Sequence, residues 1–480
     1  MTTQKSLLLL AFLATLLFSS CSRNIYPDRS QFIKDGDQLP TVNTSGYKSV
    51  QLRPAQDSSL ALALAISGGG SRAANLGIGV MLGLEKMQLP SGRNALQEID
   101  YLSTVSGGGF AGGAYIASLY DHHENQRDTV FSLHAYLDKN IRKDLSYSYT
   151  KPLFWALFNP RLWFSYLDDG DALERAIDDR VLGYRRRRSE WKAEGPVPSI
   201  MLGDLFVDRQ QSEQPVRYPM MVANGSLLDK MGIFPYTPDI LETYEICGYS
   251  HRVKKYECKE AFSNYQMPLS VGIKASGSFP ALISNTTMES TYSDDRRFLH
   301  IIDGAMTDNF GYKTAIDLLQ QDRAKRGKVL MVVDADNSGN TYTFAKKQTA
   351  RLSFKVFGRL ASSGLEARRI TLPSDLADLG SRLHFTPIIF SFNVLIRNNE
   401  NQPPPIIEIE KEQKRLIQRL EEELKGGGKP LTSFELQILY ELVTNISTKY
   451  TITADEQELL LLCGQKIVAL LEVEIRKALE

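Results

Sequence analysis

Ser106 stands in a sequence context that could make it a nucleophile. It follows the apolar run Tyr101–Val105, which predicts a short buried strand, and it precedes small and apolar residues at helical spacing over 109–120. A serine on so sharp a turn between strand and helix exposes its hydroxyl at the end of the sheet, as in a nucleophile elbow. The three glycines over 107–109 relieve crowding on the helix side of the turn. Ser106 is therefore the candidate nucleophile.

Asp303 is the candidate base for this serine. The apolar run 298–302 predicts a strand that delivers Asp303 onto Gly304 at its C-terminal end, the edge where α/β proteins place reactive groups. His300 precedes Asp303 by three residues, and because side chains alternate along a strand the two should point in opposite directions. None of the six histidines lies in an obvious triad context. The residues favour a pair of serine and aspartate.

Three consecutive glycines, Gly68, Gly69 and Gly70, lie between a predicted strand and a predicted helix. Backbone N–H groups at a helix N-terminus suit a negatively charged oxygen of either a phosphate or a tetrahedral intermediate. A phosphate-binding P-loop needs a lysine followed by serine or threonine, and a dinucleotide fingerprint needs an acidic residue at the end of the second strand; neither is present. We therefore predict that these glycines form an oxyanion hole, to which we also assign Gly107.

The elements that must position these residues form two successive strand-loop-helix units. Residues 60–66 alternate Leu or Ile with Ala, so both faces are apolar, as expected of a central parallel strand covered by helices. The first helix is expected over 73–87 and the next strand begins near 99. This order predicts an α/β layer fold with a mainly parallel sheet. Further strands are expected at 199–207, 216–224, 298–302 and 329–333.

Composition changes divide the chain into an ordered centre and two additions. We expect a catalytic domain over 60–340 with an insertion near 121–195, preceded by a polar tether over 22–59. Residues 341–480 form a C-terminal extension that is mostly helical, after a strand-like stretch at 388–395. Within it, two pairs resemble capping boxes that open helices, and one cysteine in a leucine run is expected to be a buried thiol; these residues are Thr432 with Glu435, Thr453 with Glu456, and Cys463.

The N-terminus resembles an export signal. A single basic residue, Lys5, precedes an apolar run over 7–18 that is too short to span a bilayer comfortably. Leu17–Cys21 resembles the lipobox of bacterial lipoproteins, in which Cys21 becomes the lipidated N-terminus; the alternative is a cleaved soluble signal. Ser22 behind the cysteine favours an outer-membrane lipoprotein, with the catalytic domain periplasmic or surface-exposed.

Charge and cysteine usage exclude several kinds of partner. The 56 basic and 56 acidic side chains balance, so nothing points to nucleic acid. No CxxC or His–Cys spacing suggests a metal. Cys247 and Cys258 share one polar stretch, and a local disulfide between them is plausible in an oxidising periplasm.

Four motifs in order resemble the patatin-like phospholipases: GGGSR from Gly68, SGGG from Ser106, ASGSFPAL from Ala275 and DGAMTDNFG from Asp303. The resemblance implies a three-layer α/β fold, a Ser106–Asp303 dyad without metal or organic cofactor, and hydrolysis of acyl esters, commonly of phospholipids. Arg72 is similar to the arginine after the family's oxyanion glycines, where it could contact a phosphate or form a salt bridge at the helix start.

Two other functions stay open. An acyltransferase would use the same dyad with a lipid or glycan alcohol as acceptor. A non-catalytic lipoprotein would keep the fold for lipid binding or assembly. Thr104 supports retaining this alternative, because it stands where the family's elbow has its first glycine.

The segment 147–166 is unusually rich in aromatic residues. One interpretation is a small satellite core, because aromatic side chains at this density usually bury against something. The other is a lid, since an apolar flap with basic residues would suit both headgroup contact and shelter of the ester from water. We expect Trp155 and Trp163 to decide between them.

Overall fold

The structure is a computed structural model. It describes residues 60–125, 130–156, 169–184, 199–206, 218–246, 267–280, 282–290, 297–322, 327–335, 371–397 and 409–480. The predicted lipobox at Cys21 and the cysteines Cys247 and Cys258 lie outside these ranges. In the part of the chain that is described, no helix combines the length and the apolar character needed to cross a bilayer.

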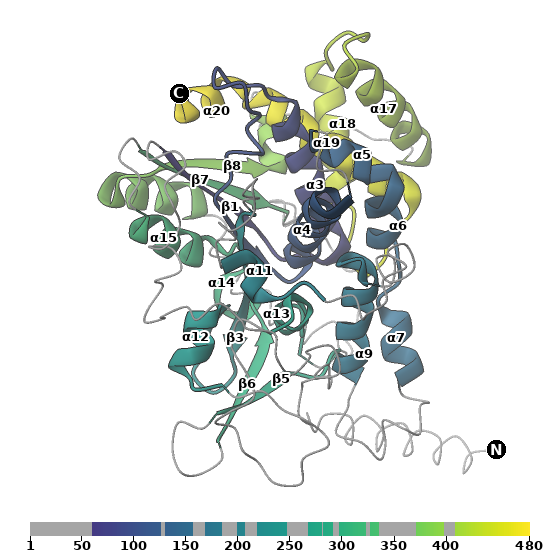
Figure 1. The fold of residues 1–480 in the computed structure, drawn as a ribbon. Coiled ribbons are helices and arrows are strands. Elements are labelled where there is room, and N and C mark those ends of the chain that lie inside the picture. Colours follow the sequence, from purple (N-terminus) through teal and green to yellow (C-terminus); the bar gives the residue numbers. More distant parts are fainter. Residues whose placement is uncertain are drawn as a thin grey trace, which may run out of the picture.

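One eight-stranded sheet organises the molecule (Figure 1). Its strand order is β5-β6-β3-β2-β1-β7-β8, with β4 paired to β3. The strands are β1 (Leu60–Ile66), β2 (Tyr101–Val105), β3 (Met220–Leu227), β4 (Gly232–Tyr236), β5 (Thr286–Ser290), β6 (Arg297–Asp303), β7 (Gly327–Asp334) and β8 (Thr386–Ser391).

The neighbouring strands β3, β2, β1, β7 and β8 are parallel to one another. The strands β4, β5 and β6 pair antiparallel with their neighbours. The predicted mainly parallel sheet is confirmed. The strand expected at 199–207 is wrong, because a helix, α11 (Leu202–Phe206), lies there. The Asp204 carboxylate accepts a hydrogen bond from the Met201 amide at 2.9 Å, which caps this turn, and a short apolar run does not by itself distinguish a strand from a buried helix.

Helices cover both faces of the sheet, which gives the predicted three-layer α/β fold. Figure 1 shows α3 (Gly70–Lys86) and α4 (Gly107–Asn125) on one side and α15 (Tyr312–Gln321) on the other. Every residue of β1 after Leu60 is buried, as its doubly apolar pattern predicts. Gly77 of α3 lets this helix pack closely, since a Cβ there would lie 3.1 Å from both Ala111 and Ile66.

Short helices form the described part of the predicted insertion. They are α5 (Leu133–Tyr136), the π-helix η2 (Leu137–Ile141), α6 (Arg142–Leu145), α7 (Thr150–Ala156), α9 (Asp169–Ala176) and the π-helix η3 (Ile177–Val181). Two further short helices, α12 (Pro238–Thr243) and α14 (Ala305–Asp308), adjoin the sheet, and α13 (Leu269–Ser276) packs against β3.

The C-terminal extension is built onto the main fold. Its strand β8 joins the central sheet beside β7, followed by the 3-10 helix η5 (Phe392–Ile396). The helices are α17 (Ile409–Leu424), α18 (Ser433–Thr444), α19 (Ala454–Leu470) and α20 (Glu472–Leu479). Both predicted capping boxes are present, and the Cys463 thiol is buried as expected.

Helix α19 packs directly against α3 (Figure 1). The two helices approach closely at Gly79 and Gly464, where a Cβ on Gly464 would lie 2.6 Å from the Gly79 backbone. Helix α3 is therefore covered by the sheet on one side and by the C-terminal extension on the other.

Candidate active site

Ser106 occupies a strained turn between β2 and α4. Its φ is +48°, a left-handed conformation that costs of order 1–3 kcal/mol for a residue with a side chain. Gly108 makes the turn possible, because a Cβ there would lie 2.4 Å from the Ile66 carbonyl oxygen. The Ser106 amide donates to the Ser276 hydroxyl at 2.8 Å. Strand, sharp turn and helix are thus arranged as a nucleophile elbow requires.

Thr104 fits into this elbow without displacing it. Its side chain is fully buried, and its hydroxyl lies 3.3 Å from the Val222 carbonyl oxygen. A glycine across the interface provides the room, since a Cβ on Gly112 would lie 2.9 Å from the Thr104 methyl group. The missing elbow glycine is therefore compensated one helical turn into α4.

Asp303 lies against Ser106. The Ser106 hydroxyl donates to Asp303 Oδ2 at 2.8 Å, and the Ala305 amide donates to Asp303 Oδ1 at 2.9 Å. The carboxylate is 2% exposed. Its position follows from β3, which runs past the end of β2 so that β6 can pair antiparallel with this overhang and place Asp303 opposite Gly225. Asp303 thus reaches the predicted edge from a strand whose direction is opposite to that of β2 and β3.

Burial tunes the carboxylate of Asp303. Desolvation raises its pKa to about 6, although the hydrogen bonds from Ala305 and Ser106 act in the opposite direction. A base with a pKa slightly below neutrality is unprotonated at pH 7 and can still accept a proton.

His300 lies away from this pair, as its position in the strand predicts. Its Nδ1 is 2.9 Å from the Thr287 hydroxyl on β5. No group of three or more His, Cys, Asp or Glu side chains in the described ranges could hold a metal ion.

The glycine loop supplies fewer amides to the site than expected. The Gly68 N–H donates to the Asn309 carbonyl at 2.8 Å, so the assignment of Gly68 to the oxyanion hole needs correction. Gly69 and Gly70 both have positive φ, +142° and +60°. Gly70 and Gly107 line the same pocket as Ser106, and each is the first residue of its helix, where the N–H has no intrahelical partner. These two amides, with Gly69, remain the predicted oxyanion donors.

Arg72 is buried and hydrogen-bonded to the backbone of two distant segments. Its side chain is 2% exposed; its Nε donates to the Ala335 carbonyl and its Nη1 to the Ile446 carbonyl, both at 2.6 Å. These bonds join α3 to the residue after β7 and to the segment before α19. The predicted phosphate contact is not what this placement supports, because the guanidinium is buried on backbone oxygens.

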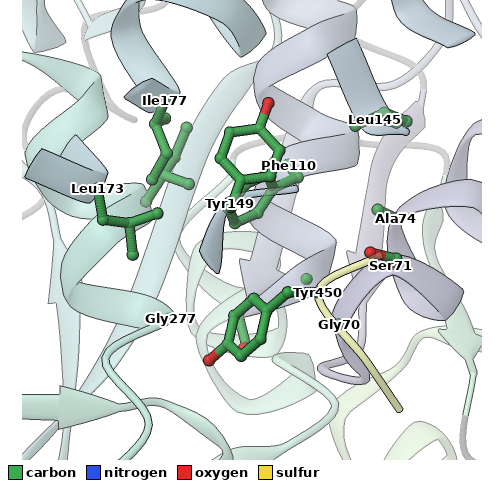
Figure 2. Close-up of a pocket in the computed structure, with 13 residues that line it drawn as sticks. Gly70, Ser71, Ala74, Phe110, Leu145, Tyr149, Leu173, Ile177, Gly277 and Tyr450 are labelled. Atoms are coloured by element: carbon green, nitrogen blue, oxygen red, sulfur yellow. The ribbon is translucent and has the colours of Figure 1, made fainter. Parts of the chain in front are cut away.

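A mostly apolar pocket opens over Ser106 (Figure 2). It holds about 450 Å³ of empty space, part of it open to solvent. Its lining combines the start of α3, the elbow, the insertion, α13 and the C-terminal extension: Gly70, Ser71, Ala74, Ser106, Gly107, Phe110, Leu145, Tyr149, Leu173, Ile177, Ile273, Gly277 and Tyr450. A serine in the wall of a mostly apolar pocket is positioned where the acyl part of an ester could bind.

The sequence model of the patatin-like phospholipase family matches residues 64–316, more than half of the chain. The chain belongs to the patatin-like phospholipase family. The resemblance inferred from the four motifs is thereby confirmed. The search of curated protein sequences found no match to this chain.

Solved structures with a similar fold include two of human GIVD cytosolic phospholipase A2. One, in complex with methyl gamma-linolenyl fluorophosphonate and terbium chloride, is 16% identical with a TM-score of 0.42, and the alignment covers 90% of this chain and 61% of that chain. The other is 14% identical with a TM-score of 0.37, covering 90% and 62%. The chain therefore spans about three fifths of the length of these chains.

The aromatic segment over 147–166 divides into two parts. Tyr149 is buried in the pocket wall, where its ring meets Phe110 edge-on at 4.9 Å, whereas Phe154 and Trp155 on α7 are exposed. Trp155 is 68% exposed. The first part fits the core interpretation, whereas the second places two aromatic side chains at the surface. Trp163 lies outside the described residues.

Two residues at the site were not singled out from the sequence. The hydroxyl of Ser276 accepts a hydrogen bond from the Ser106 amide and donates one to the Asn224 carbonyl at 2.6 Å. Ser276 lies inside the motif that begins at Ala275, and that motif is the sequence signal that could have identified it. Tyr450 lies far beyond the four motifs, and no pattern in the sequence marks it.

Proposed function

We propose that this chain is a serine acyl hydrolase that cleaves acyl esters of phospholipids or related lipids through an acyl-enzyme on Ser106. The observation that carries the proposal is the 2.8 Å hydrogen bond from the Ser106 hydroxyl, which lines an apolar pocket, to the buried Asp303 carboxylate. Membership of the patatin-like phospholipase family supports the substrate class.

In the first half of the proposed reaction, Ser106 Oγ forms a bond to the ester carbonyl carbon while its proton passes to Asp303. The carbonyl oxygen becomes an oxyanion, and we assign its stabilisation to the N–H groups of Gly70 and Gly107, which line the pocket, together with the positive end of α3. When the carbonyl re-forms, the bond to the alcohol breaks and the alcohol oxygen takes the proton from Asp303. The acyl group stays on Ser106.

In the second half a water molecule attacks the acyl-enzyme and gives a proton to Asp303. The intermediate collapses, the fatty acid leaves, and the proton returns to Ser106. The raised pKa of Asp303 suits it to both directions of transfer, because the carboxylate is ionised at neutral pH and becomes a sufficiently strong acid once protonated.

A fluorophosphonate probe tests the nucleophile, because it labels only an activated serine. Labelling of the wild type but not of Ser106→Ala supports the proposal, and labelling of neither indicates the non-catalytic lipid-binding alternative. Turnover of esters of increasing acyl length, with and without added acceptor alcohols, then separates hydrolysis from acyl transfer. If the new ester forms faster than free fatty acid in the presence of alcohol, the protein is an acyltransferase.

The proposed site of action is the cell envelope. Its support is the sequence Leu17–Cys21, which would give the mature chain a lipid anchor at Cys21 and bring the pocket to a membrane. The outer membrane remains the proposed location because Ser22 follows the cysteine.

A further inference from the structure

The segment between α18 and α19, residues 445–453, lies against the start of α3. The Ser71 amide donates to the Lys449 carbonyl at 2.8 Å, and Arg72 donates to the Ile446 carbonyl. The approach is so close that a Cβ on Gly70 would lie 2.5 Å from the Lys449 carbonyl oxygen. This connector therefore fixes the first turn of α3, next to the glycine loop, although it belongs to a region that the family match at 64–316 does not reach.

Two features hold the connector in one position. The capping box of Thr453 and Glu456 sets where α19 begins, and its N-cap Thr453 follows Tyr450 by three residues. Helix α19 is in turn fixed on α3 by close packing, since a Cβ on Gly83 would lie 2.7 Å from Val468 Cβ. The position of Tyr450 is thus fixed relative to α3, the helix that begins at the glycine loop, through the packing of α19 on α3.

Tyr450 reaches the reactive centre. Figure 2 shows its ring extending from the C-terminal segment into the middle of the pocket, and Ser106 lines that pocket too. Burial and the neighbouring Asp303 carboxylate raise the pKa of the phenol, so it is a neutral donor at physiological pH. Tyr450 makes no hydrogen bond to any residue within the described ranges. The Tyr450 side chain is half-buried, and a phenol that lines the pocket without a protein acceptor can donate to a substrate bound there.

The direction of the phenol decides which substrate atom this donor meets, because Figure 2 shows its hydroxyl on the side of the ring that faces Gly277, away from Gly70. In the proposed reaction Asp303 delivers its proton to the oxygen of the departing alcohol, so that oxygen must lie beside Asp303. The oxyanion lies on the other side of the reacting carbon, at the amides of Gly70 and Gly107. A hydroxyl directed away from Gly70 is therefore on the side of the leaving group.

We propose that Tyr450 contacts the substrate, donating a hydrogen bond from its phenol to the leaving-group oxygen of the ester. The inference rests on the proposed acyl hydrolase function and deepens it: a residue from the C-terminal extension stabilises the negative charge that develops on the departing alcohol. Tyr450 keeps its own proton throughout, while Asp303 carries the transferred one.

The test compares Tyr450→Phe with wild type on two esters of the same acyl chain. One ester has a p-nitrophenol leaving group, which departs without help, and the other has a simple alkyl alcohol, whose alkoxide is strongly basic. We expect kcat/KM to fall about tenfold for the alkyl ester, the size of one hydrogen bond made in the transition state, and less than about twofold for the nitrophenyl ester. Equal effects on both esters, or no effect, would overturn the proposal.

Tyr149→Phe is the matched control. Tyr149 lines the same pocket, but its hydroxyl already donates to the Asp144 carbonyl at 2.9 Å. Its loss should change both esters in the same proportion, through the shape of the pocket. Thermal unfolding verifies that each variant is folded, and Tyr450→Leu, which also lacks the donor, must show the same split between esters if Tyr450→Phe does not fold.

Ser106→Ala in the same assay separates the two levels of inference. If Ser106→Ala hydrolyses both esters as fast as wild type, the proposed function fails. If Ser106→Ala is inactive and Tyr450→Phe equals wild type on both esters, only the role of Tyr450 fails.

Discussion

Two segments meet at the start of α3, and they differ in how the sequence marks them. The glycine loop, Gly68 to Gly70, is recognisable because its backbone adopts positive φ and approaches other chain segments too closely for a Cβ. The connector 445–453 contacts the same turn through carbonyl oxygens of Ile446 and Lys449, which every residue type has. The close approach of the two backbones therefore requires a particular residue type in the glycine loop but not in the connector.

The comparison predicts a hierarchy of effects, in which the motif residues affect the chemistry most. Ser106→Ala and Asp303→Asn should each lower kcat/KM by about 10³-fold or more, and the double variant should be little worse than either, because nucleophile and base act as a unit. His300→Ala should keep most of the activity, since its ring contacts Thr287. An equal loss in a folded His300→Ala protein would replace the pair by a triad.

Gly70→Ala tests the contact between the two segments directly. Its Cβ would combine a φ of +60° with a clash against the Lys449 carbonyl, so we expect about 3 kcal/mol of lost stability and a large loss of turnover. Gly92→Ala is the control, because Gly92 has a φ of +80° and open space around it; about 1 kcal/mol is expected there. Equal losses, measured by denaturant unfolding, would mean that the connector does not press on the glycine loop.

The pH profile sharpens the role of Asp303. The base must be unprotonated to accept the serine proton, and burial raises its pKa to about 6. We therefore expect kcat/KM to be level above neutrality and to fall about tenfold per pH unit below about 6. Thermal unfolding over the same pH range controls for loss of the fold. An inflection near 4, the ordinary value for an aspartate, would show that burial does not act on the reacting base.

Trp155→Ala examines the exposed aromatic side chains of α7 in the insertion. Trp155 is exposed and forms an edge-on pair with Phe154, so its loss should weaken binding to phospholipid vesicles and turnover of long-chain lipids about fivefold while leaving a short soluble ester unchanged. Phe434→Ala on α18, which is 58% exposed, is the matched control. Parallel losses on both substrates together with a lower melting temperature would identify the segment as core.

Cys21→Ala should have the smallest effect on catalysis and a complete effect on processing. The variant should keep its signal segment and lack the acyl modification, because lipidation needs the cysteine thiol. Turnover of a soluble ester should not change. Mass spectrometry of the mature N-terminus is the measurement, and a wild-type chain that begins beyond Cys21 without a lipid would favour the soluble export alternative.

The sequence by itself determined the fold class, the elbow at Ser106 and the strand that carries Asp303. These follow from local rules: strands apolar on both faces lie inside a layered sheet, and glycines mark backbone that a side chain would block. The helix over 202–206 escaped these rules because a short apolar run fits either structure, and the Asp204 cap decided it.

Only the tertiary structure decided which polar groups were already used and which distant segment completes the pocket. Gly68 donates to Asn309 and Arg72 binds two carbonyls, and neither bond has a local sequence pattern. The antiparallel pairing of β6 with the overhang of β3 sets the height of Asp303 beside Ser106. Tyr450 reaches the pocket because α19 packs on α3, and a contact between residues almost 400 positions apart is fixed by the packing of whole helices rather than by residue spacing.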